Sequence, residues 1–232
     1  MTQRDIIGLV LSYAYASGLL FGMEWLGARM KWKTALTRKI IHIGAGMWAW
    51  ATLALFDHWY IGVIPFATFI GLNTYFYRAE TFGKMNDKDS SPGTIYFAIS
   101  IAILFGLLWR TGGAVNRAPI AMAGVMAMTW GDAMASIIGR KIGIRRYKTF
   151  GHTRTYEGSA AMAAFAFIAV SAALSLTAFV SPGSISIGNP AILALAAAAV
   201  ATLAEAFSPA GTDNLSVPLL VGLVVGLLNG VI

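Results

Sequence analysis

Long apolar segments alternate with short polar ones along almost the whole chain. Within the apolar segments, polar residues do not recur at every second position as they would in a half-buried strand. Runs of about 20 apolar residues match the thickness of a bilayer, where backbone groups must be hydrogen-bonded within helices. The pattern therefore predicts eight membrane-spanning helices, with seven spans and one re-entrant segment as the alternative. The predicted spans are residues 6–26, 40–56, 60–76, 94–109, 118–138, 158–180, 191–207 and 215–231.

Composition agrees with this pattern. Hydrophobic residues make up 57% of the 232 residues, and charged residues only 12%, whereas soluble domains carry about 25% charged residues. We therefore expect an all-α, polytopic transmembrane bundle that forms a single membrane domain over residues 1–232. The first run is longer than the apolar core of a cleaved signal peptide, which predicts a retained helix. The chain has no cysteine, which excludes disulfides and thiolate metal sites.

Basic residues are distributed very unevenly between the predicted loops. Of the 17 Lys and Arg residues, 14 follow the first, third and fifth spans. Because excess Lys and Arg marks cytoplasmic loops, this asymmetry predicts that both termini are non-cytoplasmic. The same rule accounts for the net charge of +7, so we expect membrane lipids and no nucleic acid among the partners. The sequence leaves a homodimer open.

The acidic residues fall into two groups. Ionisable groups inside or near membrane spans are costly and mark either a site or an ion pair. These are Glu24, Asp132, Glu157, Glu205 and Asp213. Among the other acids, Asp5 and Asp57 lie on the outer side and are expected to be solvated. Glu80, Asp87 and Asp89 share a cytoplasmic loop with three bases, where solvated pairing is expected. The loop at residues 86–93 lacks the spacing of an EF-hand.

Asp132 lies in an otherwise apolar stretch. On a helix of about 3.6 residues per turn, it shares one narrow stripe with Ala135, Gly139 and Gly143. A carboxylate beside such small side chains predicts a groove that a ligand can approach closely. Close packing between helices, with Asp132 paired to a base, explains the same pattern.

Other polar residues are expected on the same cytoplasmic side. A basic segment at residues 144–154 could hold phosphate oxygens while a nearby acid holds Mg²⁺. The helix that begins after Thr155 offers free N–H groups, although its first residues do not have the spacing of a capping box. Positive-inside charge alone is the simpler interpretation. Two further groups of polar residues could belong to this site. Alternatively, the first only anchors its helix to lipid headgroups, and the second only forms a turn with a paired Glu205. The first holds Arg38, Lys39 and His42, and the second holds Glu205, Asp213 and Asn214.

These blocks together resemble the CTP-binding signature of the polyprenol kinases. That family includes dolichol kinase, phytol kinase and the CTP-dependent diacylglycerol kinase of yeast, and is more distantly similar to phosphatidate cytidylyltransferases. In size the chain is most similar to phytol kinase. It departs from the pattern at Thr153 and Arg154, where the family usually has two lysines. The matching blocks are Arg38-Lys39-x-x-His42, Pro92-Gly93-Thr94-Ile95-Tyr96, Asp132-x-x-Ala135-x-x-x-Gly139-x-x-x-Gly143, Arg154-Thr155-x-Glu157-Gly158-Ser159 and Glu205 with Asp213-Asn214-x-x-x-Pro218.

The resemblance implies CTP-dependent phosphorylation of a long-chain isoprenoid alcohol, such as phytol, with Mg²⁺ as cofactor and an active site that faces the cytoplasm. It implies three sets of residues. Candidate catalytic residues are Asp132, His42 and Asp213. Candidate nucleotide-binding residues are Arg38, Lys39, Gly139, Gly143, Lys148, Arg154, Thr155, Gly158 and Asn214. Candidate metal ligands are Asp132, Glu157 and Glu205.

Two other functions use the same kinds of residue. Cytidylyl transfer to a lipid phosphate would need the same cations and metal-binding acids, and would release pyrophosphate instead of CDP. A transporter would also keep acids within its spans, but it predicts polar residues that reach both sides of the bilayer. The absence of Walker A and glycine-rich dinucleotide motifs argues against soluble nucleotide-binding folds.

Overall fold

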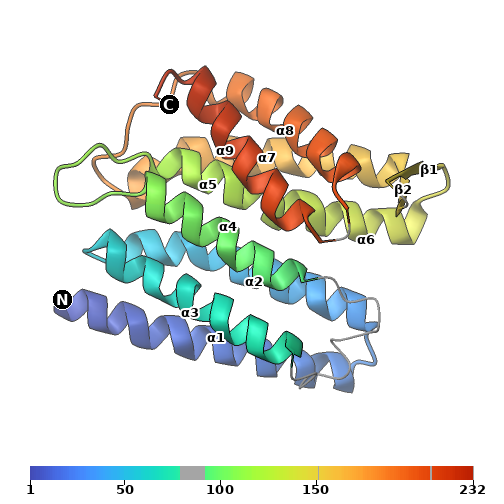
Figure 1. Ribbon diagram of the computed structural model, residues 1–232, viewed down its shortest axis with the longest axis horizontal. Helices are drawn as coiled ribbons and strands as arrows, with labels where there is room; N and C mark the ends of the chain where they lie inside the picture. The colour runs from blue at the N-terminus through green and yellow to red at the C-terminus, as the bar shows by residue number, and fades with distance from the viewer. Residues whose placement is uncertain (79–91, 151, 210, 232) are drawn as a thin grey trace.

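The computed structural model describes residues 1–78, 92–150, 152–209 and 211–231. Glu80, Asp87, Asp89 and most of the predicted loop at 86–93 lie outside these residues. Helices dominate the described part of the chain, with one two-stranded hairpin (Figure 1). The elements are α1 (Gln3–Arg29), α2 (Thr34–Leu55), α3 (Trp59–Arg78), α4 (Gly93–Leu108), α5 (Ala118–Met126), the π-helical segment η1 (Ala127–Asp132), α6 (Ala133–Ile142), β1 (Arg146–Thr149), β2 (His152–Thr155), α7 (Tyr156–Val180), α8 (Pro190–Phe207) and α9 (Asp213–Leu228).

Each of the eight apolar runs forms a helix, and α5, η1 and α6 are continuous from Ala118 to Ile142. Within the described residues, four helices are long and apolar enough to cross a bilayer, and α4 and α9 are apolar but shorter. The predicted helical membrane architecture is confirmed at this level, while the number of spans stays a prediction. The four long apolar helices are Gln3–Arg29, Ala118–Ile142, Tyr156–Val180 and Pro190–Phe207.

The continuous helix from α5 to α6 lies at the centre of the molecule. In its most apolar part 78% of the residues are buried, compared with 11% in α1, which lies at the periphery. Helix α7 packs against α5, η1, α6 and α8, while α9 packs against α4, α5 and α8. Helices α1, α2 and α3 form a separate group on the other side of α4 (Figure 1). The centre therefore holds the helix that carries Asp132.

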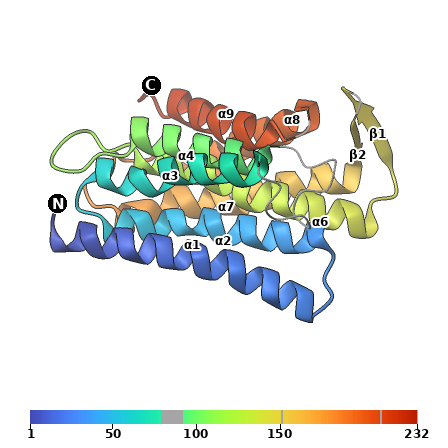
Figure 2. The same ribbon diagram turned by 60° about the horizontal axis from the view of Figure 1, so that its bottom comes forward.

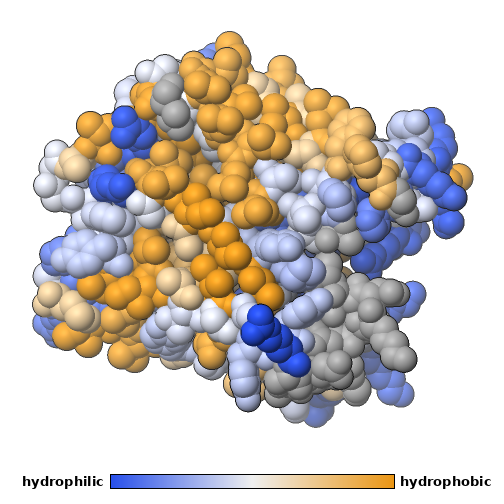
Figure 3. All heavy atoms as spheres, in the orientation of Figure 1, coloured by the Kyte–Doolittle hydropathy of each residue, from blue (hydrophilic) through white to orange (hydrophobic). Residues whose placement is uncertain are grey.

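Both termini lie at one end of the molecule, and the hairpin projects from the opposite end (Figures 1 and 2). The face in Figure 3 is hydrophobic over α4 and α9, and hydrophilic residues gather at the hairpin. An apolar band between polar ends is the distribution that a bilayer requires.

The hairpin is the part of the fold that the sequence did not predict. Strands β1 and β2 pair antiparallel, with Arg146 opposite Thr155 and Thr149 opposite His152. Four-residue strands in a basic segment carry no hydrophobic alternation, so the sequence predicted only a loop. The chain passes directly from β2 into α7, where the Thr155 hydroxyl caps the helix by accepting a hydrogen bond from the Gly158 N–H at 3.1 Å.

Asp5 contradicts the prediction that it is solvated, because its side chain is fully buried. Its carboxylate accepts hydrogen bonds from the Thr2 N–H at 2.8 Å and from the backbone of the turn before α3, and lies 2.7 Å from His58 Nδ1. It therefore joins the start of α1 to the turn between α2 and α3. Asp57 beside it remains partly exposed and pairs with Arg4 at 3.1 Å.

Candidate active site

A polar cavity of about 300 Å³ lies at the hairpin end of the helices. Residues from α2, the η1–α6 helix, β2, α7, α8 and α9 line it, so it collects side chains from almost the whole length of the chain. Three carboxylates and three basic side chains face it. The lining residues are Lys39, Asp132, Ala135, Ser136, Gly139, Arg140, Thr153, Arg154, Thr155, Gly158, Ser159, Glu205 and Asp213.

Asp132 ends the π-helical segment. Such segments place one extra residue in a helical turn and are frequent at functional sites. The widened turn packs closely against α2, because a Cβ at Gly46 would overlap the Thr129 side chain. Asp132 is 5% exposed and forms an ion pair with Lys39 from α2. The π segment thus presents a buried carboxylate to the basic residue of the neighbouring helix.

His42 lies one helical turn beyond Lys39 and approaches the same carboxylate. Its Nε2 is 4.0 Å from Oδ2 of Asp132 and 3.4 Å from the Met128 carbonyl oxygen. Its ring also packs against Phe97, with 4.2 Å between the centroids. His42 is therefore a packed residue that also borders the carboxylate of Asp132.

Arg154 connects the hairpin to α8 and α9. Its guanidinium pairs with Glu205, lies 3.6 Å from Oδ2 of Asp213 and donates to the Ser208 carbonyl oxygen at 3.2 Å. Among the residues that the structure describes, two buried atoms of this cluster have no hydrogen-bond partner, Oε2 of Glu205 and Nε of Arg154. Buried polar atoms are almost always paired, so these two indicate a ligand or water in the cavity.

The small residues of α6 allow α7 to approach closely. A Cβ at Gly139 would lie 2.8 Å from the Thr155 Oγ1, and a Cβ at Gly158 would lie 3.0 Å from the Ala135 carbonyl oxygen. Helix packing therefore explains the stripe. The groove interpretation also holds for part of it, since Ala135, Gly139 and Gly158 line the cavity.

A second cavity of about 250 Å³ adjoins the first. Lys39, Asp132, Arg140 and Asp213 line both. The structure thus brings together most of the predicted site, because the second cavity adds three more of its residues. These are Arg38, His42 and Asn214.

Three predicted site residues lie outside both cavities. Gly143 supports the hairpin, because a Cβ there would meet the Gly139 carbonyl oxygen and Thr155. Lys148 is exposed on β1. The Glu157 carboxylate accepts hydrogen bonds from the N–H groups of Ile144 and Arg145, at 3.2 to 3.3 Å, instead of facing Asp132. At the start of α7 the Glu157 side chain points toward the segment that follows α6. Its contacts therefore fix the backbone just before the hairpin.

Several cavity residues were not among the predicted site residues, chiefly Ser136, Arg140 and Ser159. The first two were accessible from spacing alone. Asp132, Ser136 and Arg140 are four residues apart, and residues at this interval share one helix face. The Ser159 hydroxyl forms a 2.7 Å hydrogen bond with the Tyr147 hydroxyl. This contact joins α7 to β1, and the sequence does not reveal it.

The acids of the cavity differ from a closed metal site made of protein ligands alone. The described residues hold no group of three or more His, Cys, Asp and Glu side chains arranged around one metal position. Mg²⁺ is usually held by one or two carboxylates together with waters and substrate phosphates. The acids of the polar cavity can supply one or two such ligands, because Asp132 and Asp213 line it beside basic residues and Glu205 has one oxygen there without a hydrogen-bond partner.

No family model and no solved structure matches the chain. Among curated proteins, it is 30% identical over 217 residues to the phytol kinase of Synechocystis, a match that covers 92% of this chain and 88% of that protein. It is 28% identical to a probable chloroplastic phytol kinase of Triticum aestivum, over 99% of this chain and 79% of that protein. It is 26% identical to the chloroplastic farnesol kinase of Arabidopsis thaliana, over 62% of this chain and 49% of that protein.

Proposed function

The chain belongs to the phytol/polyprenol kinase family of phosphotransferases, and on that premise we propose that it transfers the γ-phosphoryl group of CTP to a long-chain isoprenoid alcohol such as phytol. The reaction takes place at the cytoplasmic face of the membrane. The names of its relatives, which are phytol and farnesol kinases, support this substrate class.

One observation carries the proposal. Lys39, Arg140 and Arg154 line a single polar cavity together with three buried acids. Basic side chains that are already held in place, as Lys39 and Arg154 are by their ion pairs, can neutralise the charge of a transferring phosphoryl group with little reorganisation during the reaction. Two of these bases are paired with acids of the cavity, Lys39 with Asp132 and Arg154 with Glu205. The triphosphate would take over as the partner of the bases.

In phosphoryl transfer the protein mainly positions the reactants and stabilises charge. The alcohol oxygen forms a bond to the γ-phosphorus, the bond from that phosphorus to the β-phosphate oxygen breaks, and CDP leaves. Mg²⁺ held by Asp132 and Asp213, with the free oxygen of Glu205 beside them, would supply charge neutralisation on the phosphates. Lys39, Arg140 and Arg154 hold the phosphate oxygens, while Gly139 and Gly158 let α6 and α7 pack closely along the wall of the cavity.

The proton of the alcohol must also be accepted. His42, Asp132 and Asp213 are the candidates, and Asp132 and Asp213 are engaged by Lys39 and Arg154 respectively. His42 lines the second cavity and an apolar groove that opens from it. We assign the general base to His42 because it lies where an apolar substrate meets the polar site.

The orientation in the membrane is part of the proposal. Eight helical spans, with α5, η1 and α6 as one span, place both termini on one side and the hairpin on the other, in agreement with their positions in Figure 1. The basic residues of the hairpin end support a cytoplasmic location for that end. CTP and Mg²⁺ would then reach the polar cavity directly.

The test uses the full chain purified in detergent, with Mg²⁺ and CTP labelled at its γ-phosphate. The acceptors are phytol, farnesol, a longer polyprenol, diacylglycerol and phosphatidate. Label in an isoprenoid alcohol, lost when ATP replaces CTP as labelled donor, is the expected result. Label released as pyrophosphate with phosphatidate would make the protein a cytidylyltransferase. Folded protein that labels no acceptor at all would overturn the proposal.

A further inference from the structure

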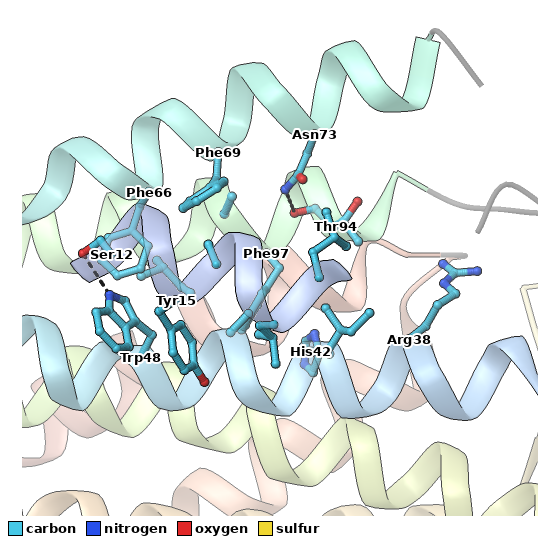
Figure 4. Close-up of a pocket in the computed structure, with 17 residues that line it drawn as sticks. Ser12, Tyr15, Arg38, His42, Trp48, Phe66, Phe69, Asn73, Thr94 and Phe97 are labelled. Atoms are coloured by element: carbon cyan, nitrogen blue, oxygen red, sulfur yellow. Dashed lines mark hydrogen bonds between the residues drawn. The ribbon is translucent and has the colours of Figure 1, made fainter. Parts of the chain in front are cut away.

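An apolar groove of about 180 Å³ runs between α1, α2, α3 and α4, outside the polar cavities. Figure 4 shows side chains from α2, α3 and α4 converging on it, with Phe97 pointing toward His42. Its walls are aliphatic and aromatic, and include Leu19, Ala45, Phe69 and Ile101. Only the His42 end of this groove takes part in the proposed phosphoryl transfer.

One end of the groove opens on the site of phosphoryl transfer. Arg38, His42 and Thr94 line both the groove and the second polar cavity. Asp132 is 4.0 Å from His42 on the polar side. A molecule in the groove can therefore place one polar group at His42 while the rest stays among apolar side chains.

The other end is bounded by Trp48. This residue is ten positions after Arg38 on α2, a distance of about 15 Å along the helix. Its indole N–H donates to the Ser12 hydroxyl at 3.0 Å, and its ring stacks on Tyr15 with 4.3 Å between the centroids. These two contacts fix the indole between α1 and α2 at the far end of the groove from Arg38 (Figure 4).

The polar groups at the Trp48 end are already engaged. The Ser12 hydroxyl donates to the Gly8 carbonyl oxygen at 2.7 Å, and the Tyr15 hydroxyl donates to the Gly44 carbonyl oxygen at 2.9 Å. A hydroxyl placed there would lose its hydrogen bonds with water in exchange for few in the protein. The groove thus has a polar end at His42 and an apolar end at Trp48.

We infer that this groove binds the hydroxyl-proximal part of the isoprenoid chain of the substrate, with Trp48 as the residue that limits how far the chain enters. The inference rests on the proposed function for the identity of the alcohol. Two features identify the alcohol as the occupant of the groove. The groove is continuous with the phosphoryl-transfer site, and both the groove and an isoprenoid alcohol have a single polar end. A phospholipid acyl chain has the same apolar chemistry, so the experiment must separate the two.

The direct test does not depend on turnover. The full chain in phosphatidylcholine nanodiscs is irradiated with an isoprenoid alcohol that carries a photoreactive diazirine on its chain, and the cross-linked peptides are mapped. We expect cross-links in α1 to α4 at residues of the groove, reduced by excess phytol. Cross-links confined to other helices, or reduced equally by excess phospholipid, would overturn the inference. Cross-links in the groove without any phosphorylation would instead contradict the proposed function alone.

A kinetic test uses Ala45→Phe, which fills the middle of the groove. The matched control is Ala164→Phe, at an exposed position of α7. In Ala45→Phe we expect the KM for phytol to rise about tenfold or more, which corresponds to about 1.4 kcal/mol, with the KM for CTP unchanged. In the control both constants should stay within about twofold of the wild-type values. Equal effects of the two substitutions on the KM for phytol would contradict the inference.

Trp48→Ala removes the end of the groove instead of filling it. We expect the ratio of kcat/KM for a longer polyprenol to kcat/KM for farnesol to rise about tenfold, because a pocket discriminates by at least that factor per methylene. Trp25→Ala on the exposed face of α1 removes an indole outside the groove and should leave this ratio unchanged. A ratio that stays constant in Trp48→Ala would show that Trp48 does not limit the chain.

Discussion

The ring of His42 and the carboxylate of Asp132 meet between two helices that are separated by more than eighty residues of sequence. His42 Nε2 lies 4.0 Å from Oδ2 of Asp132, and the same oxygen pairs with Lys39. All three side chains line the second cavity, and His42 also lines the apolar groove while Lys39 and Asp132 also line the polar cavity. Their arrangement makes the role of each testable by substitutions that keep size and remove one chemical property.

Asp132→Asn should lower kcat by about 100-fold or more while the protein remains folded. The amide keeps the shape of the side chain but neither balances Lys39 nor binds a cation, and removal of a group of this kind costs at least that factor. Glu24→Gln is the control, since Glu24 is another acid within a helix but lies outside the described cavities. Turnover near the wild-type rate in Asp132→Asn would refute its assignment.

His42→Gln should lower kcat without changing the KM for CTP. Glutamine still fills much of the space against Phe97 but cannot accept the proton of the alcohol, and loss of a general base typically costs about 100-fold or more. The measurement is steady-state kinetics with both substrates varied. His152→Gln in the hairpin, outside the described cavities, should leave kcat unchanged. A His42→Gln variant with normal kcat would transfer the role of base to Asp132 or Asp213.

Arg154 should contribute more to stability than an exposed basic residue. It serves two buried carboxylates, Glu205 and Asp213, and removing one partner of a buried pair costs about 3–5 kcal/mol. Arg154→Met should therefore lower the Tm measured in detergent far more than Arg4→Met. The Arg4–Asp57 pair is exposed, and such pairs contribute about 1 kcal/mol at most.

The double variant Arg154→Met with Glu205→Met provides an internal check. It removes one of the two uncompensated carboxylates, so part of the lost Tm should return although nucleotide binding should not. If the double variant is less stable than Arg154→Met, Glu205 is stabilised by contacts other than this ion pair.

Gly158→Ala should separate α7 from α6 and reduce both stability and activity. The added Cβ would lie 2.9 Å from Thr155 Oγ1 and 3.0 Å from the Ala135 carbonyl oxygen, and the backbone of α6 cannot yield as a flexible side chain can. Gly106→Ala is the matched control on α4, where a Cβ would meet nothing within 4 Å. There the higher helix propensity of alanine should raise stability by roughly 0.5–1 kcal/mol. Equal Tm changes would contradict the packing role of Gly158.

Hydropathy predicted the helices because burial in a bilayer acts on each apolar run independently of the others. The same locality explains what was missed. Asp5 is buried only because His58 and the turn around it meet the start of α1, a contact across more than fifty residues. The hairpin depends on the pairing of two short polar strands. The direction in which the Glu157 side chain points depends on where the chain enters that hairpin, because Glu157 accepts a hydrogen bond from Ile144 there.

Much of the candidate site could also be predicted, since charge asymmetry placed Lys39, Asp132 and Arg154 at one end of the helices. The prediction that Asp132 and Gly139 share one helix face was correct because the helix is regular from Ala133 onward. The π-helical segment Ala127–Asp132 could not be predicted, because a single widened turn leaves no periodic signal in so short a stretch. Arg140 was overlooked although its spacing from Asp132 was available.

Membrane orientation gives the last prediction, and the composition of the chain makes it simple to measure. The chain has no cysteine, so a single introduced cysteine is its only thiol. Ile144→Cys lies at the hairpin end and Val115→Cys lies between α4 and α5, and both positions are exposed. In intact cells a membrane-impermeant maleimide should label Val115→Cys but not Ile144→Cys, and it should label both after lysis. The reverse pattern would place the polar cavity, with Asp132 and Arg154, on the side of the membrane that lacks CTP, and the proposed reaction could not occur there.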